Sequence, residues 1–357
     1  MKYTINIYKK TLNFTFKAGT SRGYYNEHTS YILKLLDNNS GFVSYGECST
    51  LPNLSFDDVE NYEDILKECA LNVQDSGTLD IKKYANYPSI IFGFEMALLS
   101  QAHKNDILFD NDFTQGLLGI NINGLIWMGD FKTMQQRLVD KINDGFKCIK
   151  IKIGAIDFDK ELELLHNIRS QFDKGCVEIR VDANGAFDIS NCVDKLNALK
   201  RYDLHSIEQP IKARSWDDMA TLCQNPIIDI ALDEELIGLI SLESKRQMLD
   251  TIKPQYIVLK PSLHGGICGC NDFIYEAKKR NIGYWLTSAL ESNIALSAIA
   301  QYAASQNISM PQGLGTGLLY SNNIENKIYL KGTKMFFNAN FDKVDYDLFL
   351  DDCIKLM

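Results

Sequence analysis

The sequence predicts an α/β fold in which a TIM barrel of eight βα-type units follows an N-terminal α+β domain. From about residue 114 to 320, a short apolar or β-branched run, a turn and an amphipathic helix recur at regular spacing. Residues 1 to about 110 instead show runs of strands followed by runs of helices, which is typical of an α+β domain. An open doubly wound sheet would normally carry a glycine-rich phosphate fingerprint after its first strand, and none is present there.

These patterns divide the chain into three parts. We expect the α+β domain at 1–110, the barrel at 111–320, and a short mixed tail at 321–357 that packs back on the first domain.

The N-terminal part alternates apolar and polar residues with a period of two before it becomes helical. Antiparallel strands are predicted at 3–16 and 30–48, the latter interrupted by a turn at Asp37–Gly41. Helices are expected at 55–73 and 88–103. Two connecting loops are expected at 17–27 and 49–58.

The barrel is predicted from eight strand candidates with helical stretches between them. The candidates are 117–124, 147–154, 177–184, 205–210, 228–235, 256–262, 283–292 and 313–319. Among the helical stretches, 159–172 carries one apolar face, and 292–305 is apolar enough to pack against a sheet.

Composition narrows the class of protein. Of 357 residues, 45% are hydrophobic and 23% charged, as expected of a globular protein, and no apolar run approaches a membrane span. The first residues have no signal-peptide pattern, and nine scattered cysteines without a C-x-x-C pair indicate free thiols in a reducing cytoplasm rather than disulfides or zinc. With a net charge of −9 and no basic tract, nucleic acid and membranes are poor partners. The oligomeric state stays open.

Polar and charged side chains end five successive predicted strands. Because catalytic groups of a TIM barrel lie at the C-terminal ends of its strands, these residues form the candidate site: Lys150 and Lys152, Asp182 and Asn184, Glu208, Asp233 and Glu234, and Lys260.

The spacing of this set predicts a metal centre. Asp182, Glu208, Asp233 and Lys260 are separated by 26, 25 and 27 residues, about one βα unit each, so they should lie at equivalent heights on successive strands. Three carboxylates on adjacent strands repel one another unless a cation lies between them. Oxygen ligands without histidine or thiolate select Mg²⁺ or Mn²⁺.

Each motif taken alone has a simpler interpretation. In "CIKIKIG" (148–154) the two lysines alternate with isoleucines, which also suits a solvated edge strand. "DANG" (182–185) is a good Asx-turn, and the acids of "LDEE" (232–235) suit a helix N-terminus. Independent features have no reason to recur once per strand at the same end, which favours a site.

The same motifs resemble a known family. "KIK" (150–152), "DANG", "EQP" (208–210), "LDEE" and "LKPS" (259–262) resemble the enolase superfamily, specifically its muconate-lactonizing branch. The resemblance covers nearly the whole chain, since 44–55 is similar to the capping-domain loop of that branch. Residues 180–187 and 287–304 resemble most closely the o-succinylbenzoate synthase family.

The resemblance implies a (β/α)7β-type TIM barrel with an N-terminal capping domain, and a small-molecule carboxylate as substrate. It implies Mg²⁺-assisted removal of a proton next to the carboxylate, then syn elimination of water to give o-succinylbenzoate in menaquinone biosynthesis. Lys152 would be the acid/base, and Lys260 would stay charged on the opposite face. Lys150 would lower the pKa of Lys152. The other expected supporting or substrate-binding residues are Arg180, Asn184, Glu234, Ser288, Gly315 and Thr316.

Other activities remain open at this point. An N-acylamino acid racemase or a dipeptide epimerase would use both lysines as bases on the same frame. Dipeptide epimerases of this branch usually place acids after the eighth strand, and "GLGTGLLYS" (313–321) has none. A metal-free barrel using a lysine as Schiff-base nucleophile is a further alternative. A non-catalytic binding barrel has little support, because buried charges without a role would only cost stability.

Overall fold

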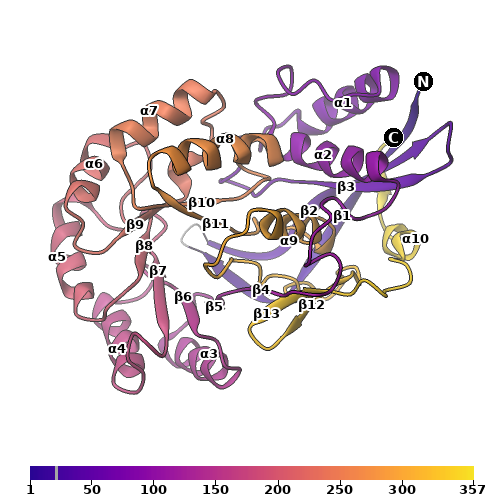
Figure 1. The fold of residues 1–357 in the computed structure, drawn as a ribbon. Helices are drawn as coiled ribbons and strands as arrows, with labels where there is room; N and C mark the ends of the chain where they lie inside the picture. Colours follow the sequence, from indigo (N-terminus) through magenta and orange to yellow (C-terminus); the bar gives the residue numbers. More distant parts are fainter. Residues whose placement is uncertain (21–22) are drawn as a thin grey trace.

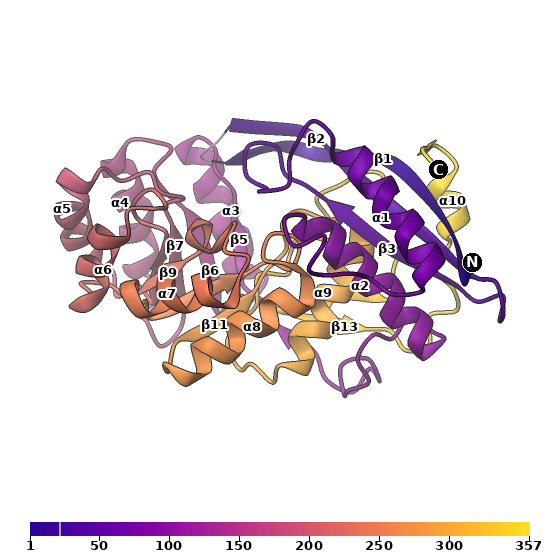
Figure 2. The same ribbon diagram turned by 90° about the horizontal axis from the view of Figure 1, so that it is seen from above.

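The computed structural model describes residues 1–20 and 23–357, and places an antiparallel sheet with two helices beside a curled parallel sheet wrapped by helices (Figures 1 and 2). Within this part of the chain the strands form a four-stranded, a seven-stranded and a three-stranded sheet. The predicted α/β class and the barrel behind an N-terminal α+β unit are therefore confirmed. None of the helices described is both long and apolar enough to cross a membrane.

The N-terminal sheet is antiparallel and buries one face. Its strands β1 (Tyr3–Thr20), β2 (Gly23–Asp37) and β3 (Val43–Ser49) pair in that order. Cross-strand neighbours Ile5 and Leu35 are both buried, because alternate residues of a strand point to the same face. That face packs against α1 (Tyr62–Ser76) and α2 (Pro88–His103). The predicted turn between β2 and β3 is present, with the Gly41 N–H bonded to the Asp37 carbonyl at 2.8 Å.

The barrel sheet has seven parallel strands in chain order. They are β5 (Gly124–Ile126), β6 (Cys148–Lys152), β7 (Glu178–Asp182), β8 (Ser206–Glu208), β9 (Ile230–Leu232), β10 (Tyr256–Leu259) and β11 (Gly283–Leu286).

A helix follows each of these strands and covers the outer face of the sheet (Figure 1). The helices are α3 (Phe131–Asn143), α4 (Phe158–Arg169), α5 (Ile189–Lys200), α6 (Trp216–Gln224), α7 (Leu242–Ile252), α8 (Gly266–Lys279) and α9 (Asn293–Ser305), with a short 3₁₀ turn η1 (Glu234–Leu236) after β9. Strand residues such as Ile149, Ile151 and Val181 are buried in the core between sheet and helices.

An irregular segment closes the barrel between its first and last strands. Gln312 forms a parallel bridge with Ile122, just before β5, and Gly313 forms one with Thr287, just after β11. The Gly313 N–H donates to the Leu286 carbonyl at 2.8 Å, and the Asn123 N–H donates to the Gln312 carbonyl at 3.0 Å. The eighth position is thus held by two residues and not by a full strand.

The C-terminal tail returns to both halves of the molecule. β12 (Ile328–Lys331) and β13 (Lys334–Phe337) form a small sheet with β4 (Ile120–Asn121). After α10 (Tyr346–Leu350), β14 (Ile354–Lys355) pairs with β1. We therefore propose domain boundaries near residues 110 and 320, with the end of the tail packing on the N-terminal domain.

Several predicted boundaries were wrong. The first barrel strand lies at Gly124–Ile126, because residues 120–121 pair with the tail sheet instead. The segment 313–319 forms no strand, since its alternating glycines offer few side chains to pack on a pleated surface. Much of the loop expected at 17–27 belongs to β1 and β2, while residues 21–22 of that loop lie outside the described residues. The helix expected from residue 55 begins only at Tyr62.

Candidate active site

Strand alternation places the two lysines of β6 inside the barrel mouth. β6 lies between β5 and β7, so it is a central strand and the edge-strand interpretation is wrong. Ile149 and Ile151 pack toward the helices, whereas the side chains of Lys150 and Lys152 are 12% and 13% exposed and line the central pocket. Nearby carboxylates offset the electrostatic cost of pointing two ammonium groups into the barrel.

Lys150 and Lys152 face three buried carboxylates on the next strands. Asp182 ends β7, Glu208 ends β8, and Asp233 directly follows β9; these residues are 0%, 2% and 0% exposed. Asp182 and Glu208 are Cα partners in the parallel register, which brings their side chains to one height.

Each carboxylate contacts a lysine ammonium group. Lys152 Nζ lies 2.5 Å from Asp182 Oδ2, and Lys150 Nζ lies 2.7 Å from the same oxygen. Lys150 also donates to both carboxylate oxygens of Glu208 at 2.7 Å. On the far side, Lys260 donates to Asp233 Oδ2. Three ammonium groups thus face three carboxylates.

Burial and charge shift these groups in opposite directions. Burial, followed by the charge of Asp182, raises the pKa of Glu208 well above its ordinary value. Burial would also raise the pKa of Asp182, but Lys150 and Lys152 outweigh it and hold that pKa below its usual range. Burial would lower the pKa of Lys260, but the charge of Asp233 raises it. The site therefore favours a cationic Lys260.

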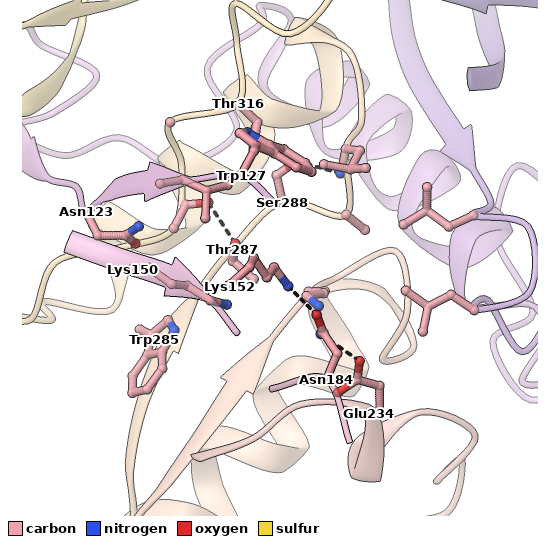
Figure 3. A pocket seen from close by; sticks show the side chains of 18 of the residues that line it. Asn123, Trp127, Lys150, Lys152, Asn184, Glu234, Trp285, Thr287, Ser288 and Thr316 are labelled. Atoms are coloured by element: carbon pink, nitrogen blue, oxygen red, sulfur yellow. Dashed lines mark hydrogen bonds between the residues drawn. The ribbon is translucent and has the colours of Figure 1, made fainter. Parts of the chain in front are cut away.

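Two hydrogen bonds link Lys152 to Asn184 and Asn184 to Glu234 along the barrel mouth (Figure 3). Lys152 Nζ donates to Asn184 Oδ1 at 2.9 Å, and Asn184 Nδ2 donates to Glu234 Oε1 at 3.0 Å. Asn184 has φ +44°, in the left-handed region that asparagine tolerates better than most residues. Asn184 of "DANG" and Glu234 of "LDEE" therefore both help to orient the Lys152 side chain.

Most of the predicted side chains meet in one pocket, and some do not. Among the residues that line it are Lys150, Lys152, Asn184, Glu234, Lys260, Ser288, Gly315 and Thr316. The three carboxylates lie buried behind the lysines. Arg180 lies elsewhere: it is 2% exposed, bonds Glu178 and the Pro311 carbonyl, and stacks its guanidinium on Trp285, 4.4 Å from the ring centroid. Since Trp285 lines the pocket, Arg180 supports the pocket from beneath.

Sequence reasoning missed the apolar and neutral polar part of this pocket. Its further lining residues are Tyr25, Leu51, Leu54, Asn123, Leu125, Trp127, Trp285, Thr287, Ala289 and Leu290. Thr287 directly follows β11, so the strand-end rule that located the charged residues could have found it. Asn123 precedes β5, and that rule does not point to it. Tyr25, Leu51 and Leu54 come from the N-terminal domain, where no spacing in the barrel points to them. The Tyr25 hydroxyl donates to the Pro52 carbonyl at 3.2 Å, which ties these two segments together.

The donor set fits a hard divalent cation. All three carboxylates are buried together on adjacent strands, and Asp233 Oδ1 has no hydrogen-bond partner among the described residues. Oxygen-only donors suit Mg²⁺ or Mn²⁺. Within residues 1–20 and 23–357, however, no group of three or more His, Cys, Asp or Glu side chains is arranged to hold a metal ion as it stands. In this arrangement Lys150, Lys152 and Lys260 contact oxygens of the three carboxylates.

Known proteins share this sequence and this architecture. The family described as "Enolase C-terminal domain-like" matches residues 133–326. The o-succinylbenzoate synthase of Desulfotalea psychrophila is 42% identical over 91% of this chain and 96% of its own length. The crystal structure of MenC from the same organism superposes with a TM-score of 0.79 and 37% identity, covering 94% of this chain and 100% of that one.

A more distant structure has the same fold. The N-succinyl Arg/Lys racemase from Bacillus cereus superposes with a TM-score of 0.82 over all of both chains at 20% identity. The family match spans more than half of the chain. The chain belongs to the enolase superfamily.

Proposed function

We propose that the chain acts as an o-succinylbenzoate synthase, a carbon–oxygen lyase that eliminates water from a cyclohexadiene carboxylate to give o-succinylbenzoate. The observation that carries the chemistry is the placement of Lys152 and Lys260 four strands apart, with three carboxylates on the strands between them. In an eight-position barrel, four strands apart is the opposite side of the mouth. The relative that is 42% identical supports the choice of substrate.

Lys152 is the proton carrier in this proposal. As a neutral amine it removes the proton from the carbon next to the substrate carboxylate, and the electron pair moves toward that carboxylate. The resulting ammonium then donates the proton to the departing hydroxyl on the same face, so water leaves and the ring becomes aromatic. Asn184 and Glu234 hold the Lys152 side chain along the path between these two positions.

Lys260 and Lys150 act through their charge. Lys260 stays cationic on the opposite face and stabilises the negative charge that develops in the transition state. Lys150, which bridges Asp182 and Glu208, adds a second positive charge beside Lys152.

Asp182, Glu208 and Asp233 would hold the Mg²⁺ ion. When bound, this ion supplies a Lewis acid that neutralises charge on the substrate carboxylate, as is general for enolase-superfamily sites. Manganese would serve the same donor set.

The neutral polar side chains that line the pocket favour a substrate with a succinyl group over a dipeptide. Asn123, Thr287, Ser288 and Thr316 offer neutral hydrogen-bonding groups there. Thr316 is 4% exposed, and its hydroxyl has no partner among the described residues. Apart from Glu234, which bonds Asn184, no acid of the described chain lines the pocket. A dipeptide ammonium would lack a counter-charge there. A carboxylate can accept from Asn123 and Thr316, whereas the Thr287 and Ser288 hydroxyls already donate to the Gly313 carbonyl and to Glu291.

Racemisation of N-acylamino acids is the second candidate, because both lysines face the same space and the neutral wall also suits an N-succinyl group. A direct comparison separates the candidates. The kcat/KM should be highest for the cyclohexadiene precursor in the presence of Mg²⁺, lower for N-succinyl amino acids, and negligible for dipeptides. The reverse order would replace the dehydratase by a racemase, and EDTA-resistant activity with borohydride-trapped substrate would replace both by Schiff-base chemistry.

The cellular compartment of the enzyme, the cytoplasm, is also part of this proposal. All nine cysteines are free thiols in the structure, which supports the predicted reducing cytoplasm.

A further inference from the structure

A buried glutamate outside the catalytic set joins the turns that follow β10 and β11. Glu291 is 0% exposed and accepts hydrogen bonds from the Ser288 hydroxyl at 2.7 Å and the Ala289 N–H at 2.6 Å. It also accepts from the Ser262 hydroxyl. One carboxylate therefore satisfies three donors that come from two separate segments.

Both segments form walls of the pocket. Ser262 follows Lys260 by two residues, so its hydroxyl fixes the turn that carries the Lys260 backbone. The pocket is also lined by Ser288, Ala289 and Leu290, which follow the neighbouring strand β11. Leu290 has φ +68°, an unusual conformation for a residue with a branched side chain, and its N–H donates to the Ser288 hydroxyl at 2.9 Å. Such a turn persists only where its surroundings hold it.

A second glutamate anchors the same turn from the N-terminal domain. Glu47, on β3, is 0% exposed and accepts from the Ser292 N–H at 2.8 Å, the Ser292 hydroxyl at 2.6 Å and the Ala295 N–H at 3.0 Å. These N–H groups open helix α9, where a negative charge is favourable. Glu47 thus anchors Ser292, the residue that directly follows Glu291.

We propose that Glu291 is a positioning residue that keeps Lys260 and the 288–290 wall in one arrangement, and that Glu47 transmits the docking of the N-terminal domain to it. The proposal rests on the proposed function in that it takes Lys260 and this wall as parts of the active site. Through its bond to Ser262 the Glu291 carboxylate fixes the position of Lys260 and therefore affects kcat. Through its bonds to Ser288 and Ala289 it fixes the 288–290 wall and therefore affects KM.

The test combines kinetics with amide hydrogen exchange of the full chain. Glu291→Gln replaces a charged acceptor by a neutral one of the same shape, so we expect kcat/KM to fall about tenfold or more, as for loss of one charge-assisted hydrogen bond. Exchange of the amides at 288–290 and 262–264 should rise by a similar factor. Glu291→Asp should recover part of both, and Ser262→Ala should lower kcat while leaving KM close to wild type.

The matched control is Glu276→Gln. Glu276 is also a buried glutamate, 1% exposed on α8, but its ion pairs are with Arg246 and Arg280 away from the pocket. Its variant should leave both kinetic constants and these exchange rates unchanged. Unchanged kinetics and exchange in Glu291→Gln would overturn the proposal. Should that variant fail to fold, an unchanged kcat in Ser262→Ala would overturn it equally.

The exchange readout needs no turnover. If the wild-type protein lacks dehydratase activity, the proposed function fails, while the exchange rates still decide whether Glu291 holds the two turns together.

Discussion

Lys152 and Asp182 are Cα partners on neighbouring parallel strands, and their charged groups lie 2.5 Å apart. The same register pairs Lys150 with Arg180. Ile149 and Ile151, which alternate with the two lysines of β6, face the helices. Because side chains alternate along a strand, a slip of one residue would turn both lysines into the helix layer. The pairing of β6 with β7 thus fixes the relation between the proposed base and a proposed metal ligand.

Replacing Lys260 by alanine should slow dehydration without stopping proton exchange. The variant loses the cation opposite Lys152 and leaves Asp233 without its ion pair. We expect kcat to fall by about 10²–10³, the range for removing one group that stabilises transition-state charge. Lys152 should still exchange the substrate α-proton with deuterated solvent, as followed by NMR. Loss of exchange in Lys260→Ala with its retention in Lys152→Ala would reverse the assigned faces.

Removal of divalent metal should abolish activity and lower stability. Dialysis against EDTA should eliminate dehydration, and Mg²⁺ should restore it. Ligand binding to the folded state adds about 2.7 kcal/mol to the free energy of unfolding at a concentration of 100 times Kd. Thermal unfolding should therefore shift upward with Mg²⁺ in the wild type and not in Asp233→Asn. A shift of equal size in that variant would argue against Asp233 as a ligand.

Replacing Thr316 by valine should weaken substrate binding while the fold stays intact. The change removes a buried hydroxyl that has no partner among the described residues and keeps the side-chain shape. A lost hydrogen bond to a charged group is worth about 1.5–3 kcal/mol, so KM should rise about tenfold or more with little change in Tm. The exposed Thr251→Val on α7 is the control. An unchanged KM would remove Thr316 from the substrate-binding set.

Glu95 should make stability depend on pH. This residue of α2 accepts from the Ile267 and Cys268 N–H groups at 2.5 and 3.0 Å, and burial raises its pKa from 4.5 to about 7. The folded protein therefore holds the proton more tightly than the unfolded chain, so this stabilisation is complete below pH 4.5 and is lost as the pH rises through 7.

The measurement is urea unfolding of wild type and Glu95→Gln at pH 5 and pH 8. Relative to the variant, the wild type should lose up to about 3 kcal/mol between these two values, since one pKa unit corresponds to 1.36 kcal/mol. Glu163→Gln on the exposed side of α4 controls for the loss of one charge. A pH-independent difference between wild type and Glu95→Gln would contradict this assignment.

The charged half of the site could be predicted from the sequence because barrel geometry is periodic. One polar residue per βα unit, always at the strand end, is sufficient to bring Asp182, Glu208 and Asp233 to one height. The apolar half has no such period. Leu51 and Leu54 reach the pocket from another domain, and only the docking of that domain determines which of its side chains enter.

Elements with weak side-chain packing were also the ones misplaced. The segment 313–319 was predicted as the eighth strand, but only Gln312 and Gly313 pair with their neighbours. Arg180 follows the same alternation as Lys150, yet it contacts Trp285 and Glu178 rather than the three carboxylates of the site. Sequence position places a side chain on a face, whereas its contacts depend on depth along the strand.

The most direct test of the account is the rate of dehydration by Lys152→Ala with saturating Mg²⁺ and the cyclohexadiene precursor. General acid–base catalysis contributes about 10²–10⁴, and Lys152 serves in both proton transfers, so kcat should fall at least 10³-fold while the circular dichroism spectrum stays that of the wild type. Lys147→Ala, an exposed lysine just before β6, should keep full activity. Turnover of Lys152→Ala within tenfold of wild type would contradict Lys152 as the base.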